Sequence, residues 1–343
     1  MKIDRDPMLT DELEVASSTL SAEPSAPAAD QSSASERGKD TVPQGRIGFV
    51  GLGRMGKVMA ANLAAAGREV IAYVRRPEQI ERLAPLGLRA TMDFAELFDC
   101  EFVITMLPND EAVREVVIGG LGDGLAAGMR PGAIHLSMST ISTATASQLA
   151  RELAHYGQGY IAAPVFGNPD AARARELFII AAGAEADLDR CQPIFAALGQ
   201  QVFRVGNDPA IANLVKLAGN AMSAATLEVL GEILALARKR GCDPRQLLAI
   251  LTGTMFGSRI HKIYGKKIAE QQYGSAGFVF PLALKDVRLA LNEAELAGVP
   301  MPSLSVVRDR LITGIARGYS ECDWSALGML AAEEAGLCGK TVN

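Results

Sequence analysis

The sequence predicts an α/β protein in which a doubly wound, mostly parallel sheet is followed by an all-helical domain. Three observations lead to this prediction. Short apolar runs alternate with helical stretches from Arg46 to about residue 205. A GxGxxG motif lies between the first apolar run and the first helical stretch. After Asp208 the strand patterns stop, and helical periodicity continues to Leu337.

Residues 1–44 form a segment of different composition before this pattern begins. They are rich in Ser, Ala, Pro and acidic residues, and their four basic and nine acidic side chains account for the whole formal charge of −5. Their few apolar residues bury too little surface to offset the entropy cost of ordering, so we expect a disordered tail. The segment lacks the basic start and apolar core of a secretory signal.

The strands of the predicted sheet are apolar runs that helical stretches separate in the first half of the domain. This alternation indicates parallel strands, because a parallel connection requires a crossover that a helix usually supplies. We expect them to form a dinucleotide-binding domain over residues 45–207. The runs lie at residues 47–50, 69–74, 101–106, 132–137, 158–162, 177–181 and 201–205.

The second domain, predicted over residues 208–337, begins with a long helix that joins it to the first. Residues 209–240 keep helical periodicity and end in basic residues before Gly241, which favours a helix C-terminus. Asp243 and Pro244 then begin another helix, in the usual order of a capping residue followed by proline.

Charge, hydropathy and cysteine content disfavour several classes of protein. Beyond residue 44 the basic and acidic residues balance, so no general field attracts nucleic acid or an anionic membrane. No uninterrupted apolar run approaches the ~20 residues of a membrane span, so we expect a soluble protein. The five scattered cysteines include no CxxC pair, which indicates reduced thiols and a cytoplasmic location. The three histidines lie far apart, so we expect no metal site, and His135 is expected to pack within a strand.

The glycine motif has the context that dinucleotide binding requires. It follows the strand pattern RIGFV and begins an alanine-rich helix, as in a Rossmann unit. The first glycine permits a tight turn, the second lets backbone amides reach a pyrophosphate, and the third allows close packing of helix on strand. A glycine turn that merely joins strand to helix is the disfavoured alternative. The motif comprises Gly51, Leu52, Gly53, Arg54, Met55 and Gly56.

Two arginines stand where units that bind NAD usually place an acidic residue. The second strand ends near Val74 and is followed by Arg75 and Arg76, and the next carboxylate is Glu78. A carboxylate would repel the extra phosphate of NADP, whereas a guanidinium binds it through paired hydrogen bonds. The two arginines therefore indicate NADP(H), although a solvated pair at a strand end is also compatible with them.

The candidate proton donor is Lys216, four residues before Asn220 on the predicted long helix. At this spacing both side chains project from one face of the helix. A partly desolvated lysine donates a proton to a carbonyl oxygen during hydride transfer, and the amide orients the substrate. From the spacing alone, an ordinary surface lysine is the more common explanation. No tyrosine precedes a lysine by four residues, so short-chain dehydrogenase chemistry is absent.

Several short motifs together resemble those of the β-hydroxyacid dehydrogenases, in the same order and spacing over roughly residues 46–335. The first domain is similar to the NAD-binding domain of 6-phosphogluconate dehydrogenase. The family includes 3-hydroxyisobutyrate dehydrogenase and the glyoxylate and succinic semialdehyde reductases, and its members usually assemble as homodimers or homotetramers, which the resemblance implies for this chain. The motifs are GFVGLGRMGKVMAANL, MLP at 106–108, STIS at 139–142, APV at 163–165, KLAGN at 216–220 and LKD at 284–286.

The resemblance implies a role for each matching residue. Lys216 is the implied catalytic lysine, and Asn220 orients the substrate beside it. Arg75 corresponds to the family arginine that binds the 2′-phosphate. The implied contacts at the nicotinamide end of the cofactor come from Met106, Leu107, Pro108, Thr140 and Lys285.

The substrate loop departs from the family pattern, which reads Ala-Pro-Val-Ser-Gly-Gly and binds a carboxylate. Here Phe166 takes the place of the serine, Gly167 is kept, and Asn168 replaces the second glycine. Arg175 stands at a later glycine position. Phe166 either contacts the substrate or packs within the loop, since a phenyl ring donates no hydrogen bond. Asn168 and Ser139 are candidate replacement donors; alternatively, the pocket accepts a larger and more apolar carbonyl compound.

We therefore expect an NADP(H)-dependent oxidoreductase that interconverts a small aldehyde or keto compound, of the oxo-acid or semialdehyde type, and its hydroxy form. The partner is a small molecule, with no nucleic acid and no membrane. One alternative is an imine reductase on the same scaffold, although such enzymes generally lack the lysine. Another is a catalytically silent NADPH-binding scaffold protein.

Overall fold

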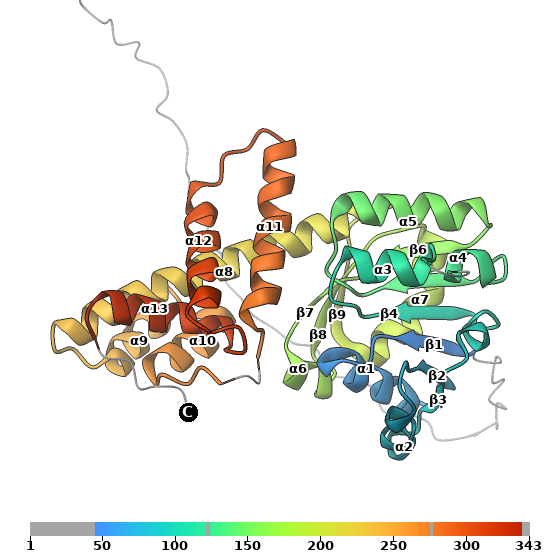
Figure 1. Ribbon diagram of the computed structural model, residues 1–343, viewed down its shortest axis with the longest axis horizontal. Helices are drawn as coiled ribbons and strands as arrows, with labels where there is room; N and C mark the ends of the chain where they lie inside the picture. Colours follow the sequence, from blue (N-terminus) through green and yellow to red (C-terminus); the bar gives the residue numbers. More distant parts are fainter. Residues whose placement is uncertain (1–44, 121–123, 275–276, 338–343) are drawn as a thin grey trace, which may run out of the picture. The chain divides into compact units, whose positions relative to one another are not determined.

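The computed structural model describes residues 45–120, 124–274 and 277–337 (Figure 1). The predicted tail, residues 1–44, lies outside the described residues.

A six-stranded parallel sheet forms the core of the N-terminal part, with the strand order β3-β2-β1-β4-β5-β6. This is the Rossmann order, in which ligands bind where the strand order reverses, beside the carboxyl ends of β1 and β4. Strands β1, β4 and β5 are buried along their whole length, which explains why most of their residues are apolar. The strands are β1 (Ile47–Val50), β2 (Val70–Tyr73), β3 (Arg89–Thr91), β4 (Phe102–Thr105), β5 (Ile134–Ser137) and β6 (Gly159–Ala162).

Helices cover both faces of this sheet, so the fold is doubly wound as the sequence predicts. Helix α1 (Arg54–Ala65) and helix α7 (Glu185–Leu198) contribute to one apolar cluster. Helices α3 (Asp110–Val117), α4 (Leu125–Gly128) and α5 (Thr143–His155) contribute to the other. The short elements after β2 and β3 are η1 (Pro77–Gln79), α2 (Ile80–Leu83), η2 (Ala84–Leu86) and η3 (Phe94–Leu97).

A second, three-stranded sheet differs from the expectation of one continuous sheet. It contains β7 (Val165–Phe166), β8 (Leu177–Ala181) and β9 (Gly199–Arg204), with β7 antiparallel to β8. An isolated bridge between Ala162 and Ala182 links it to β6. The apolar runs at 177–181 and 201–205 are strands as predicted, but their sheet depends on β7 and on α6 (Pro169–Arg173). Strands β3 and β7 are not among the predicted strands, because a segment of two or three residues has too short a pattern to indicate a strand.

The C-terminal part is all-helical and is built on one long helix, α8 (Pro209–Lys239). The first turns of α8 contact α5 and β6, and later turns contact α10, α11 and α13. Asp243 caps the start of α9, as the sequence predicts, and Asp208 caps the start of α8 in the same way. The remaining elements are α9 (Pro244–Gly253), α10 (Arg259–Ala269), α11 (Phe280–Leu296), α12 (Pro302–Ala316), η4 (Trp324–Ala326) and α13 (Leu327–Glu334).

By length and composition alone, α8 could cross a membrane, although no uninterrupted apolar run in the sequence indicates this. Its most apolar 18-residue window has a mean hydropathy of 1.2, and 56% of that window is buried inside the protein. The buried side is lined by neighbouring helices and carries Lys216, Asn220 and Glu228. These features are those of a core helix of a helical domain.

His135 packs within β5, as expected for a strand residue. Its ring is fully buried and its Nε2 lies 3.0 Å from the Thr105 hydroxyl. Burial lowers the pKa of His135 to about 3, so the ring is neutral at physiological pH.

Candidate active site

The glycine loop between β1 and α1 has the shape that a dinucleotide pyrophosphate requires. Gly51 has a φ of +98°, and a Cβ there would lie 2.3 Å from the Met106 carbonyl oxygen. A Cβ at Gly56 would lie 1.9 Å from the Gly51 carbonyl oxygen. A Cβ at Gly53, by contrast, would have no heavy atom of the described residues within 4 Å. The N-terminus of α1 is therefore open to an anionic ligand, and the loop fits a nicotinamide dinucleotide.

Arg75 and Arg76 lie at the same edge of the sheet as the glycine loop. Strand β2 pairs with β1 in parallel register, with Tyr73 opposite Val50. The two arginines follow the end of β2 and are both exposed. Since parallel strands end at one edge, both arginines follow β2 at the edge where the ribose end of a dinucleotide is expected.

A pocket of about 510 Å³ lies where this edge of the sheet faces the helices α8, α10 and α11. Most of the predicted site residues meet there. Lys285 of α11 donates a hydrogen bond of 2.5 Å to the Thr140 carbonyl oxygen. The predicted residues that line the pocket are Arg54, Met55, Met106, Leu107, Pro108, Thr140, Phe166, Gly167, Asn168, Lys216, Asn220 and Lys285.

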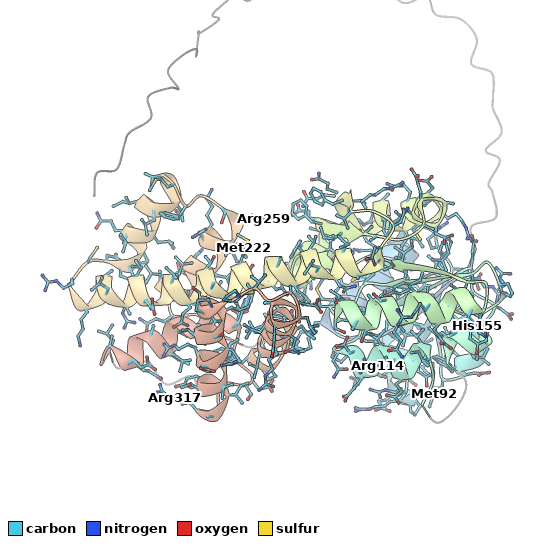
Figure 2. All side chains as sticks on the ribbon, turned by 90° about the horizontal axis from the view of Figure 1, so that it is seen from above. Met92, Arg114, His155, Met222, Arg259 and Arg317 are labelled. Carbon is cyan, nitrogen blue, oxygen red and sulfur yellow. The ribbon has the colours of Figure 1, made fainter. Side chains whose placement is uncertain are left out.

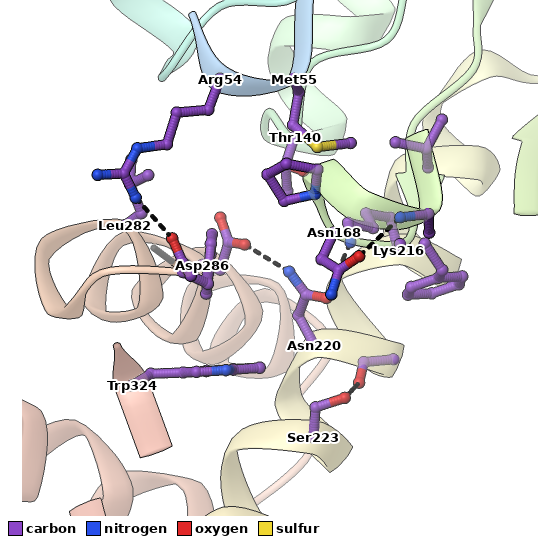
Figure 3. Close-up of a pocket in the computed structure, with 18 of the residues that line it drawn as sticks. Arg54, Met55, Thr140, Asn168, Lys216, Asn220, Ser223, Leu282, Asp286 and Trp324 are labelled. Atoms are coloured by element: carbon purple, nitrogen blue, oxygen red, sulfur yellow. Dashed lines mark hydrogen bonds between the residues drawn. The ribbon is translucent and has the colours of Figure 1, made fainter. Parts of the chain in front are cut away.

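Three buried polar side chains form a connected chain in this pocket (Figure 3). Lys216 Nζ donates to Asn220 Oδ1 at 2.9 Å, one helical turn away on α8. Asn220 Nδ2 donates to Asp286 Oδ2 of α11 at 2.5 Å. Asp286 Oδ1 also lies 2.9 Å from Lys285 Nζ. Lys216 is therefore a buried and oriented amine, which excludes the explanation of an ordinary surface lysine.

Burial lowers the pKa of Lys216 to about 8, because a charged ammonium is costly away from water. The Asp286 carboxylate opposes this shift, and the Lys285 ammonium adds to it. A pKa near 8 suits an amine that gives and accepts protons close to neutral pH.

Phe166 packs directly against the amine. Lys216 Nζ lies 4.5 Å from the centre of the Phe166 ring, within the range of a cation–π contact. The ring occupies space that only glycine leaves open on α8, because a Cβ at Gly219 would lie 2.3 Å from Phe166 Cζ. Phe166 thus both contacts Lys216 in the pocket and packs within the fold.

Asn168 and Arg175 of the same loop have structural roles that the sequence does not indicate. Asn168 Oδ1 caps α6 by accepting from the Ala171 amide at 2.9 Å. Arg175, at a glycine position of the family pattern, keeps a left-handed φ of 60°. This conformation costs an arginine about 1 kcal/mol relative to glycine.

Ser139 requires a correction, because its side chain does not face the pocket. It is only 1% exposed. Its hydroxyl accepts from the Leu107 amide at 2.8 Å and donates to the Thr105 carbonyl oxygen at 3.3 Å. Ser139 therefore fixes the loop after β4, and it is not available to a substrate carboxylate.

Sequence reasoning also missed residues of the pocket. Asp286 belongs to the LKD motif, which could have marked it as a candidate site residue. Nothing in the sequence indicates that it contacts Asn220. Arg259 and Glu176 meet at the pocket mouth, with 3.5 Å between Nη2 and Oε2. The aromatic side chains Phe178, Tyr264, Phe278 and Trp324 line the walls.

A Rossmann sheet with an open glycine loop, facing a buried lysine, defines the class of nicotinamide-dinucleotide-binding proteins with a helical second domain. Two family models match the chain in this order. Residues 46–206 match the NAD binding domain of 6-phosphogluconate dehydrogenase. Residues 211–331 match the NAD-binding domain of NADP-dependent 3-hydroxyisobutyrate dehydrogenase.

Similar proteins identify the family. The chain is 37% identical over 284 residues to an uncharacterized oxidoreductase, YfjR, of Bacillus subtilis, covering 82% of this chain and 98% of that protein. It is 31% identical over 284 residues to 2-hydroxy-3-oxopropionate reductase of Escherichia coli, covering 82% and 95%. The protein belongs to the β-hydroxyacid dehydrogenase family. The relatives that it resembles are named as oxidoreductases.

Solved structures show the same architecture. 3-Hydroxyisobutyrate dehydrogenase of Salmonella typhimurium has a TM-score of 0.74 and 25% identity, covering 83% of this chain and 99% of that one. An imine reductase from Pseudomonas sp. has a TM-score of 0.55 and 19% identity, covering 84% and 99%. The second likeness concerns the fold alone.

Proposed function

We propose that this protein is an NADP(H)-dependent oxidoreductase that interconverts a small aldehyde or keto compound and its hydroxy form. The observation that carries this proposal is the buried chain from Lys216 through Asn220 to Asp286 in a pocket that the cofactor-side loops also line. The relative named 2-hydroxy-3-oxopropionate reductase supports a small carbonyl substrate.

Each polar residue of the chain has a distinct part in this reaction. NADPH, when bound, supplies the hydride to the carbonyl carbon. Lys216 Nζ gives a proton to the carbonyl oxygen, so that no alkoxide is released into a pocket with mostly apolar walls. Asn220 Oδ1 accepts from Nζ and holds the amine in one orientation. Asp286 accepts from the Asn220 amide and thereby fixes which way that amide points.

The preference for NADP(H) is proposed from the strand end after β2. Arg75 and Arg76 are exposed there, and Glu78 belongs to η1 beyond Pro77. Guanidinium groups at this position favour the 2′-phosphate, whereas NAD-binding units present a carboxylate to the ribose hydroxyls.

The test is NADPH consumption with a panel of aldehydes, 2- and 3-oxo acids and cyclic imines. Reduction of carbonyl compounds, abolished by replacing Lys216, is the expected result. Turnover of imines alone would identify an imine reductase, and NADPH binding without any turnover would identify a silent scaffold; either result overturns the proposal.

We also propose that the chain forms a homo-oligomer through α8 and resides in the cytoplasm. Met222, Val229 and Leu236 follow one another at seven-residue intervals on α8 and are 74%, 56% and 58% exposed (Figure 2 labels Met222). A seven-residue repeat places them on one side of the helix, where an identical helix can pack around a two-fold axis. The free thiols of Cys100, Cys191, Cys242 and Cys322 support the cytoplasmic location.

A further inference from the structure

The pocket has an aromatic wall that is already assembled. The Trp324 ring lies 5.0 Å from Phe278 and 5.6 Å from Tyr264, centre to centre, and both pairs meet edge to face. Phe178 of β8 also lines the pocket. Rings packed against one another in this way keep their positions, so apolar contact area is available without a cost of ordering.

Phe166 extends the apolar surface to the proton donor itself. The loop pattern that this chain resembles has a serine at this position, which offers a hydroxyl to a substrate carboxylate. Here a ring lies 4.5 Å from Lys216 Nζ and is seated on Gly219. A substrate group bonded to the reacting carbonyl carbon would therefore lie against the Phe166 ring.

The cationic side chains that line the described part of the pocket are already engaged. Arg259 lies 3.5 Å from Glu176, and Lys285 lies 2.9 Å from Asp286. Arg54 donates to the Gly277 carbonyl oxygen at 3.2 Å.

The nearest hydroxyl on α8 is engaged as well. Ser223 donates to the carbonyl oxygen of Gly219 at 2.8 Å. A substrate carboxylate would have to displace such partners, and it would also face the Glu176 and Asp286 carboxylates.

We propose that the substrate is a small carbonyl compound with an uncharged, apolar body, such as an aryl or alkyl aldehyde, rather than a small carboxylate. This inference rests on the proposed reductase function and narrows the substrate class of that same pocket. The apolar body contacts Phe166, Phe178 and the Trp324 wall, while the carbonyl oxygen reaches Lys216 Nζ. Two observations disfavour a carboxylate in the pocket: the loop has no serine at position 166, and Arg259 and Lys285 are paired with carboxylates.

The first experiment compares kcat/KM for two matched series with NADPH as the reductant. Phenylacetaldehyde and hexanal form the uncharged series, and glyoxylate and succinic semialdehyde form the carboxylate series. The uncharged series should be preferred by about tenfold or more, the discrimination that burying a few methylene groups provides. A preference of the same size for the carboxylates overturns the inference while leaving the reductase function intact.

A pair of variants tests whether the aromatic wall is the cause. Phe178→Ala should raise KM for phenylacetaldehyde roughly tenfold with little change in kcat, because it removes binding surface and not the proton donor. Phe203→Ala is the matched control, since Phe203 lies 6.4 Å from Phe178 and does not line the pocket. Equal KM values for wild type and Phe178→Ala would contradict the assignment.

A binding measurement separates the inference from the proposed function. Calorimetry on the complex with NADPH should show tighter binding of phenylacetamide than of succinate, whether or not any carbonyl compound turns over. Preferential binding of phenylacetamide without turnover would refute the reductase function and support the apolar pocket. Tighter binding of succinate would refute the apolar pocket.

Discussion

The ammonium group of Lys216 is held 2.9 Å from Asn220 Oδ1 and 4.5 Å from the centre of the Phe166 ring. If this group gives the proton, Lys216→Ala should lower single-turnover rates by about 10²–10⁴ and leave the Kd for NADPH nearly unchanged. Lys216→Arg should lower the single-turnover rate almost as much, because a guanidinium keeps its proton at any physiological pH. Asn220→Ala should lower the single-turnover rate less than either substitution of Lys216. A near-normal rate in the alanine variant would assign the proton to another donor.

The pH dependence follows from the lowered pKa of Lys216. Reduction requires the protonated amine, so its rate should fall as pH rises through about 8, and oxidation should rise over the same range. Because the Asp286 carboxylate favours the charged amine, Asp286→Asn should lower the pKa of Lys216 further. The alkaline limb of reduction should then move to lower pH. Glu176→Gln, a carboxylate of the same pocket paired with Arg259, is the control and should leave the limb in place.

Arg75 is expected to set the cofactor preference. The wild type should bind NADPH at least about tenfold more tightly than NADH, a difference of about 1.4 kcal/mol. Arg75→Ala should remove most of that difference, and Arg76→Ala should remove less of it. Arg82→Ala, an exposed arginine of α2, should leave the ratio of the two Kd values unchanged. Equal affinities in the wild type would show that the two arginines are only solvated.

At the scale of elements, the loop from β6 to β8 packs closely against helix α8 at one point. Phe166 fits only because Gly219 has no side chain. Phe166→Ser should raise the activity on glyoxylate relative to phenylacetaldehyde, since it removes the ring and adds a hydroxyl.

The contact between the two elements predicts a coupling. Gly219→Ala alone should lower the free energy of unfolding by roughly 1–3 kcal/mol, the usual effect of overpacking, and should cost much less in the Phe166→Ser background. Denaturant unfolding of the four proteins measures this difference. Additive effects of the two changes would show that ring and helix do not compete for the same space.

At the scale of the whole molecule, the exposed apolar side chains of α8 predict assembly. Met222→Asp and Val229→Asp should each convert the proposed homo-oligomer to a monomer, because each buries an unpaired charge in the proposed interface. Light scattering after size-exclusion chromatography measures the mass in solution. Met92→Asp, at a 47% exposed apolar residue of the sheet domain, is the control and should leave the mass unchanged (Figure 2). A monomeric wild type would refute the proposed interface.

The sequence by itself determined the features whose causes act within a few residues. The spacing of Gly51, Gly53 and Gly56 after a buried strand predicted the loop and the start of α1, because a side chain at Gly51 or Gly56 would clash with the adjacent backbone. Asp243 before Pro244 predicted the start of α9 through a local cap. The four-residue spacing of Lys216 and Asn220 placed them on one face of a helix, where they form a hydrogen bond.

Only the tertiary structure decided the contacts between elements that are far apart in the chain. Asp286 meets Asn220 across 66 residues, and no local pattern indicates that α11 packs against α8 at this level. Ser139 is turned toward the backbone after β4, although its position beside Thr140 made it a reasonable candidate for the pocket. The Phe166 ring rests on Gly219 of another element. Such contacts arise from how whole elements bury their apolar faces, a property that periodicity and spacing do not encode.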